Sequence, residues 1–164
     1  MYRFCLTIFL RVSKLPGMTF ITDRAIDDVG GVLELARRWE EAWNAHDADG
    51  VAALCAEELV YDEPALGGTA YGRESIRELV RSLARAFPDH VFSVVGVYAD
   101  VQRRSVIVAW CLRGTHARTG RLVEFHGDDR LDVGEDGLIA EHRCLYDSDL
   151  VGKQVRGEEA AAAA

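Results

Sequence analysis

Asp129 is the residue whose type and position say most about chemistry in this sequence. It lies in the segment 121–133, where the other odd-numbered positions after Arg121 are Val123, Phe125, Gly127, Leu131 and Val133. Side chains alternate between the two faces of a strand, so this pattern predicts a strand whose buried face carries one carboxyl group. Because an ionised carboxylate alone among apolar side chains is costly, we expect Asp129 to be paired or protonated.

The segment 138–147 adds uncharged polar groups to the same face. Its even positions carry no permanent charge, whereas its odd positions include Glu141, Arg143 and Asp147, so we expect the even set to turn inward. The inward side chains of interest are His142, Cys144 and Tyr146.

Glu63 ends a short predicted strand directly before Pro64, where the chain is expected to pass the mouth of the sheet. A carboxylate, an acid in an apolar wall, an imidazole and a phenol in one cavity form a general acid–base site. We assign Glu63 as the candidate base, Asp129 as a neutral hydrogen-bond donor to developing negative charge, and His142 as the group that shuttles or orients the proton. The predicted substrate-binding residues are Trp39, Tyr61, Leu131, Cys144 and Tyr146.

Each assignment has a structural alternative. Asp129 suits a buried structural acid, Glu63 a solvated turn residue, and His142 a core or rim histidine with all its hydrogen bonds made. Cys144 suits a small side chain that fills space, because a nucleophilic thiol needs a lowered pKa.

Hydrophobic periodicity predicts the elements that must position these side chains. Apolar residues at helical spacing indicate helices over Asp28–Ala45, Asp49–Ala56 and Arg73–Phe87, and Gly67-Gly68 indicates a loop. Strands are predicted at Leu59–Glu63, His90–Ala99, Arg104–Thr115, Arg121–Val133 and Leu138–Asp147. Helices before strands, with short turns between the strands, predict an α+β fold in which helices pack on one face of an antiparallel sheet.

Composition narrows the partners and the location. The 164 residues carry a net charge of −8 without a basic cluster, which disfavours nucleic acid and anionic membrane surfaces. The four cysteines are far apart, so we expect reduced thiols in a cytoplasmic protein and no metal site. Without a nucleotide-binding motif, we expect no cofactor. We interpret residues 1–17 as an N-terminal extension, 18–157 as a single domain and 158–164 as a disordered tail.

The chain resembles the nuclear transport factor 2-like superfamily, in particular its SnoaL-like polyketide cyclase branch. The segments that carry the resemblance are AWNAHDADGVAALCAEELVYDEP, YGRESIRELVRSLARAFPDHVFSV, WCLRGTH, GRLVEF, DGLIAEHRCLYD and LVGKQVRG, which together span roughly 33–157. The resemblance implies a cone-shaped sheet wrapped by about three N-terminal helices around an apolar pocket. It also implies a homodimer, a hydrophobic small-molecule substrate and proton transfer without a cofactor.

Carried over residue by residue, the resemblance is partial. Ketosteroid isomerases use an aspartate before proline, where this chain has the longer Glu63, and a protonated aspartate, which Asp129 matches. Their tyrosine donor on the first helix is replaced by Trp39, which offers only an indole N–H. Aldol-type cyclases and epoxide hydrolases place a catalytic aspartate in the last strand, where this chain has Cys144. We therefore expect an acid–base enzyme that cyclises, isomerises or opens an epoxide in a polyketide-type metabolite. The alternative is a small-molecule-binding or dimeric scaffold protein without catalytic activity.

Overall fold

The computed structural model describes residues 29–158, and within them one mixed sheet organises the chain. Its six strands lie in the order β2-β1-β6-β5-β4-β3. β1 and β6 pair in parallel and all other neighbours pair antiparallel. The strands are β1 (Cys55–Glu63), β2 (Gly68–Tyr71), β3 (Val91–Asp100), β4 (Ser105–Thr115), β5 (Leu122–Val133) and β6 (Ile139–Tyr146).

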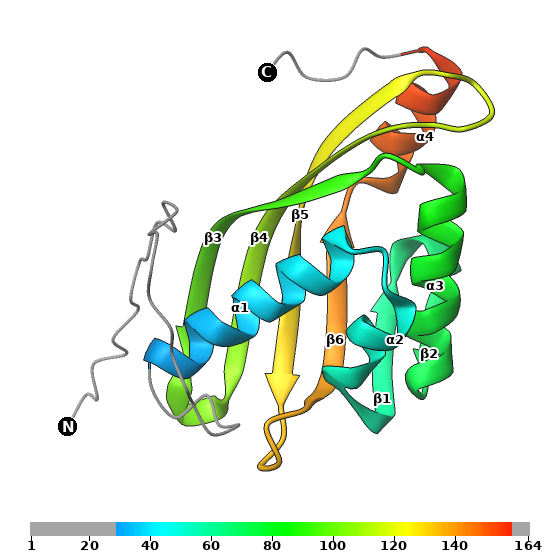
Figure 1. Ribbon diagram of the computed structural model, residues 1–164. Helices are drawn as coiled ribbons and strands as arrows, with labels where there is room; N and C mark the ends of the chain where they lie inside the picture. Colours follow the sequence, from blue (N-terminus) through cyan, green and yellow to red (C-terminus); the bar gives the residue numbers. More distant parts are fainter. Residues whose placement is uncertain (1–28, 159–164) are drawn as a thin grey trace.

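Four helices accompany this sheet in the described part of the chain. They are α1 (Val29–Asn44), α2 (Ala48–Ala53), α3 (Arg73–Ala86) and α4 (Ser148–Arg156). Figure 1 shows α1 crossing one face of the curved, open sheet, α3 beside β1 and β2, and α4 near the turn that joins β4 to β5. The predicted α+β fold, with helices on one face of a curved sheet, is confirmed.

Helix α1 is attached to the sheet by aromatic packing and by one side-chain amide. The rings of Trp39 and Trp43 lie 5.3 and 5.2 Å from that of Phe92 on β3. Asn44 donates to the Phe92 carbonyl at 2.9 Å and accepts from the Phe92 amide at 2.8 Å. The amide therefore satisfies backbone groups of the strand at the edge of the sheet, where no further strand is present.

Helix α4 was not among the predicted elements, although its two ends carry clear signals. The Asp147 carboxylate accepts from the Leu150 amide at 2.9 Å, and Gly157 ends the helix with a φ of 78°. The buried Gln154 amide then pairs with the backbone of Glu124 on β5 through two hydrogen bonds of 2.8 Å. This pairing holds α4 on the sheet.

Two predicted elements near β1 are corrected by the structure. The second helix ends at Ala53 rather than Ala56, and Cys55 already belongs to β1. The segment predicted as a loop at 67–68 leads into β2, which pairs with β1 between Val60–Tyr71 and Glu63–Gly68. Glycine-rich edge strands resemble turns in sequence, because their pairing is decided by the neighbouring strand.

The predicted extension over 1–17 lies outside the described residues, as do residues 159–164 of the predicted tail. Within residues 29–158, no helix is both long and apolar enough to span a membrane. The domain boundaries, the cytoplasmic location and the homodimer remain predictions.

Candidate functional site

A cavity of about 250 Å³ lies between the sheet and the helices. Aromatic side chains from five different elements form much of its wall. They are Trp43 of α1, Phe92 of β3, Trp110 of β4, Phe125 of β5, and Tyr146 of β6. Leu79, Ser82 and Leu83 of α3 and Val151 of α4 contribute to the remaining wall. Every strand except the edge strand β2 therefore contributes to one predominantly apolar chamber.

Glu63 lines this cavity with a carboxyl group that accepts three hydrogen bonds. Tyr146 donates to Oε1 at 2.6 Å, the Ala65 amide donates to the same oxygen at 3.0 Å, and Tyr61 donates to Oε2 at 3.1 Å. Glu63 ends β1 and caps the short 3-10 turn Pro64–Leu66, which explains why its side chain points inward and is only 4% exposed. Glu63, directly before Pro64, therefore both caps the turn and lines the cavity.

Both phenols that bind Glu63 remain protonated across the physiological range. Burial, followed by the negative charge of Glu63, raises the pKa of Tyr61 well above its usual value. Burial and the hydrogen bond to Glu63 also raise the pKa of Tyr146. The two tyrosines are therefore permanent donors at this corner of the cavity.

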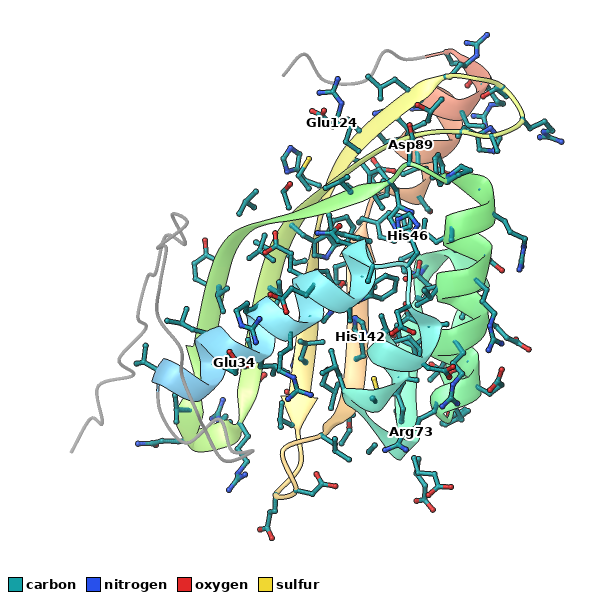
Figure 2. All side chains as sticks on the ribbon, viewed as in Figure 1. Glu34, His46, Arg73, Asp89, Glu124 and His142 are labelled. Carbon is teal, nitrogen blue, oxygen red and sulfur yellow. The ribbon has the colours of Figure 1, made fainter. Side chains whose placement is uncertain are left out.

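Asp129 also lines the cavity but has a different set of partners. His142 Nε2 lies 2.8 Å from Asp129 Oδ2, and the two side chains are 1% and 3% exposed. Asp129 Oδ1 and His142 Nδ1 have no hydrogen-bond partner among the described residues. Asp129 is thus paired, which is one of the two outcomes expected from its buried position. Figure 2 shows His142 on β6 in the interior, whereas Glu124 of β5 lies near α4.

Strand register brings the two carboxyl groups into one site. Asp129 is opposite Cys144 in the antiparallel β5–β6 pair, and His142 is beside Tyr61 in the parallel β1–β6 pair. Cys144 lines the cavity, and burial, followed by the charges of Asp129 and Glu63, raises its pKa well above the usual range. The Cys144 side chain is therefore a thiol rather than a nucleophilic thiolate.

The described residues provide no metal site: no group of three or more His, Cys, Asp or Glu side chains within 29–158 is arranged to hold an ion. The functional groups that line the cavity are carboxyls, phenols, a thiol, indoles and the Ser82 hydroxyl, and the imidazole of His142 lies behind Asp129.

Residues 36–142 match the SnoaL-like domain family. The chain belongs to this family. Solved structures agree with this SnoaL-like assignment at the level of fold. A candidate polyketide cyclase from Xanthomonas campestris is 21% identical, with 76% of this chain and 96% of that chain covered and a TM-score of 0.66.

Two further structures show the same fold. A Catenulispora acidiphila protein with a ketosteroid isomerase-like fold, solved with trimethylamine, is 18% identical over 75% of this chain and 92% of that chain, with a TM-score of 0.67. The epoxide hydrolase/cyclase-like enzyme SalBIII, which acts in pyran ring formation in the polyether salinomycin, is 19% identical. The match covers 76% of this chain and 96% of that chain, also with a TM-score of 0.67. No curated protein matches the sequence.

The structure places five of the eight predicted site residues of this SnoaL-like domain on the cavity. They are Tyr61, Glu63, Asp129, Cys144 and Tyr146. His142 lies directly behind Asp129 and is 1% exposed. The predicted catalytic role of His142, to shuttle or orient the proton, remains a proposal.

Trp39 and Leu131 do not line the cavity, contrary to their prediction as substrate-binding residues. Trp39 is 1% exposed and packs on Trp43, which lies one turn further along α1 and reaches the cavity in its place. Leu131 is 0% exposed and is opposite His142 in the β5–β6 register, so it belongs to the core.

The aromatic wall was missed from the sequence, apart from Tyr61 and Tyr146, although one residue indicates its position. Gly127 lies on the cavity-facing side of β5, and a Cβ atom there would be 2.4 Å from the Trp110 ring. A glycine within a strand often marks such a close approach. Gly127 therefore makes room for the Trp110 indole.

Proposed function

We propose that this SnoaL-like protein is a cofactor-independent acid–base enzyme that acts on a hydrophobic small molecule. Its reaction class is cyclisation, isomerisation or epoxide opening of a polyketide-type metabolite. The observation that carries the proposal is a difference between two carboxyl groups in one cavity. Glu63 accepts three hydrogen bonds, whereas Asp129 has one oxygen bound to His142 and one without a partner.

This difference supports separate roles for the two groups. A carboxylate only accepts hydrogen bonds, so three donors fit Glu63 as the group that takes up a proton. Asp129, held at Oδ2 by the imidazole, keeps Oδ1 for a proton that it donates to the ligand. His142 is a positioning residue in this scheme, because Asp129 lies between it and the cavity.

Ring formation from a hydroxy-epoxide illustrates the proposed step. The hydroxyl oxygen attacks one epoxide carbon, the epoxide C–O bond breaks, and a new C–O bond forms. Glu63 accepts the proton of the attacking hydroxyl, and Asp129 gives its proton to the epoxide oxygen. Each positioned proton-transfer group contributes about 10²- to 10⁴-fold to the rate of such a reaction.

Two small test substrates examine the proposal. 5-Nitrobenzisoxazole reports proton abstraction, and styrene oxide reports epoxide opening. We expect turnover of at least one of them by the wild-type protein and a loss of about 10²-fold or more on Glu63→Gln or Asp129→Asn. Glu135→Gln removes an exposed carboxylate from the turn between β5 and β6 and serves as the charge-matched control.

The second candidate is a non-catalytic binding protein for the same class of ligand. It is favoured by Cys144, which has a high pKa at the position where related enzymes carry a catalytic aspartate. Calorimetry separates the two functions. If both test substrates bind in a 1:1 ratio and Trp110→Leu weakens binding, but the wild-type rate equals the buffer rate, the enzymatic proposal is wrong.

A further inference from the structure

The charge character of the cavity points to a more specific ligand. Among the described residues that line it, the acidic side chains are Glu63 and Asp129, and no Lys, Arg or His is present. The imidazole of His142 lies behind Asp129 and is bound to it at 2.8 Å. The wall thus offers acidic groups without a basic side chain to balance them.

The acidic groups share the cavity with a run of aromatic rings. Phe92, Trp110 and Phe125 form two edge-to-face contacts, with ring centroids 5.1 and 5.6 Å apart and interplanar angles of 80°. Tyr146 continues the run, 5.2 Å from Phe125 at 45°. Because the rings are tilted against one another, the run presents π faces in more than one direction. The face of an aromatic ring is the negative end of its quadrupole and attracts cations.

A chamber with this lining discriminates between ligands by charge. In a site with little water, the attraction between a cation and a carboxylate or an aromatic face is stronger than in bulk solvent. An anion, including an enolate or an alkoxide without a donor, meets the opposite potential. The indole N–H groups of Trp43 and Trp110 are buried without a partner. They are neutral donors, which fit an ether or hydroxyl oxygen and leave the acidic groups uncompensated.

We propose that the cavity recognises a positively charged centre that carries apolar substituents. Two sources share this chemistry: an alkylammonium group of the ligand, or positive charge that develops on carbon when a ring is opened with help from an acid. This inference deepens the proposed function, since it favours epoxide opening or cation-like cyclisation over isomerisation through an enolate. It concerns binding at the same site and does not require turnover.

A matched set of benzyl compounds tests the proposal by calorimetry. Benzyltrimethylammonium, neopentylbenzene and benzylsulfonate have similar shapes and carry a positive charge, no charge and a negative charge. We expect the cation to bind at least tenfold more tightly than the neutral compound, and we expect no measurable binding of the sulfonate. Equal or tighter binding of neopentylbenzene, or binding of the sulfonate, overturns the proposal.

Variants locate the charge preference. Glu63→Gln should weaken binding of the cation severalfold. Asp129→Asn exchanges a protonated acid for a neutral amide and should weaken it less, and both variants should leave neopentylbenzene within twofold of its wild-type affinity. Glu135→Gln removes one negative charge, as Glu63→Gln does, but lies outside the cavity and should change neither affinity. If Glu135→Gln weakens the cation as much as the cavity variants do, the preference comes from overall charge and the proposal is wrong.

A fourth compound distinguishes the two sources of charge. Protonated benzyldimethylamine carries an N–H that can donate to a carboxylate, which the quaternary compound lacks. Tighter binding of the amine indicates an ammonium ligand, and equal binding indicates recognition of charge alone, as in a cationic transition state. If the protein prefers the cation but turns over neither test substrate, this inference holds and the enzymatic proposal is wrong. If it turns over a test substrate but shows no preference for the cation, the enzymatic proposal holds and this inference is wrong.

Discussion

The cavity has two acidic corners, Glu63 with its hydrogen-bond donors and Asp129 with His142, and their hydrogen bonding differs. The Glu63 corner gathers three donors, two of them phenols from β1 and β6 and one a backbone amide of the following turn. The Asp129 corner relies on one side chain, His142, and leaves one carboxyl oxygen without a partner. Both corners are almost fully buried, so the difference lies in their hydrogen bonds and not in their exposure.

This comparison separates stability from function. A group with several donors loses a fraction of its stabilisation when one is removed, whereas a group with a single partner loses all of it. The Glu63 corner is therefore the robust one. The Asp129 corner keeps an unsatisfied oxygen, which is costly in the absence of a ligand and is the feature most typical of a functional group.

Removal of His142 should have the largest effect on stability. His142→Leu leaves both oxygens of the buried Asp129 without a partner, and we expect a loss of about 3 kcal/mol, the upper end of the cost of a buried polar group left unsatisfied. Urea unfolding measures the change. The double variant His142→Leu, Asp129→Leu should recover most of the loss, because no polar group is then left unpaired. A loss below about 1 kcal/mol in the single variant would mean that the pair contributes little.

Removal of one donor from Glu63 should cost less. Tyr146→Phe deletes the 2.6 Å hydrogen bond but leaves the donors from Tyr61 and Ala65 in place. We expect a loss of about 1.5 kcal/mol, the usual contribution of a hydrogen bond to a charged group. Tyr71→Phe is the matched control, since Tyr71 is 73% exposed and should not change the unfolding free energy. If Tyr146→Phe and His142→Leu cost the same, the two corners do not differ as described.

Much of the Asp129 corner could be predicted from alternation along single strands. Val123, Leu131 and Val133 are buried on the face that carries Asp129, and His142 and Cys144 are buried on the same face of the neighbouring strand β6. A strand has only two faces, so the position of its single carboxyl group follows once the apolar face is recognised. Alternation along one strand cannot identify the hydrogen-bond partner of Asp129 on the neighbouring strand. The Asp129–His142 contact depends on the β5–β6 register.

The aromatic wall was harder to predict because it depends on how elements cross. Trp39 and Trp43 lie one helical turn apart, and both are buried. Which of them reaches the cavity is decided by the position of α1 on the curved sheet, and this has no local signal. The parallel pairing of β1 with β6, which brings Tyr61 next to His142, joins segments about eighty residues apart and is likewise invisible to periodicity.

Alkaline pH should reveal a further effect at the Glu63 corner. Burial and the charge of Glu63 raise the pKa of Tyr61 in the folded state above its usual value of about 10. Above that pH the unfolded chain has released this proton and the folded chain still holds it, so the unfolded state binds fewer protons. Between the pKa values of Tyr61 in the unfolded and folded states, the unfolding free energy then falls with rising pH by about 1.4 kcal/mol per pH unit. At pH 7 both states hold the proton, so Tyr61 ionisation does not change the unfolding free energy there.

The Tyr61→Phe variant isolates this contribution. Its unfolding free energy should be lower than wild type at neutral pH, because a hydrogen bond to Glu63 is lost. Between pH 10 and 11, however, its stability should decline less steeply than that of the wild type, whereas Tyr71→Phe should decline as steeply as the wild type. Parallel curves for Tyr61→Phe and the wild type would mean that the phenol does not stay protonated beside Glu63, and the Glu63 corner would then lose one of the permanent donors that distinguish it from Asp129.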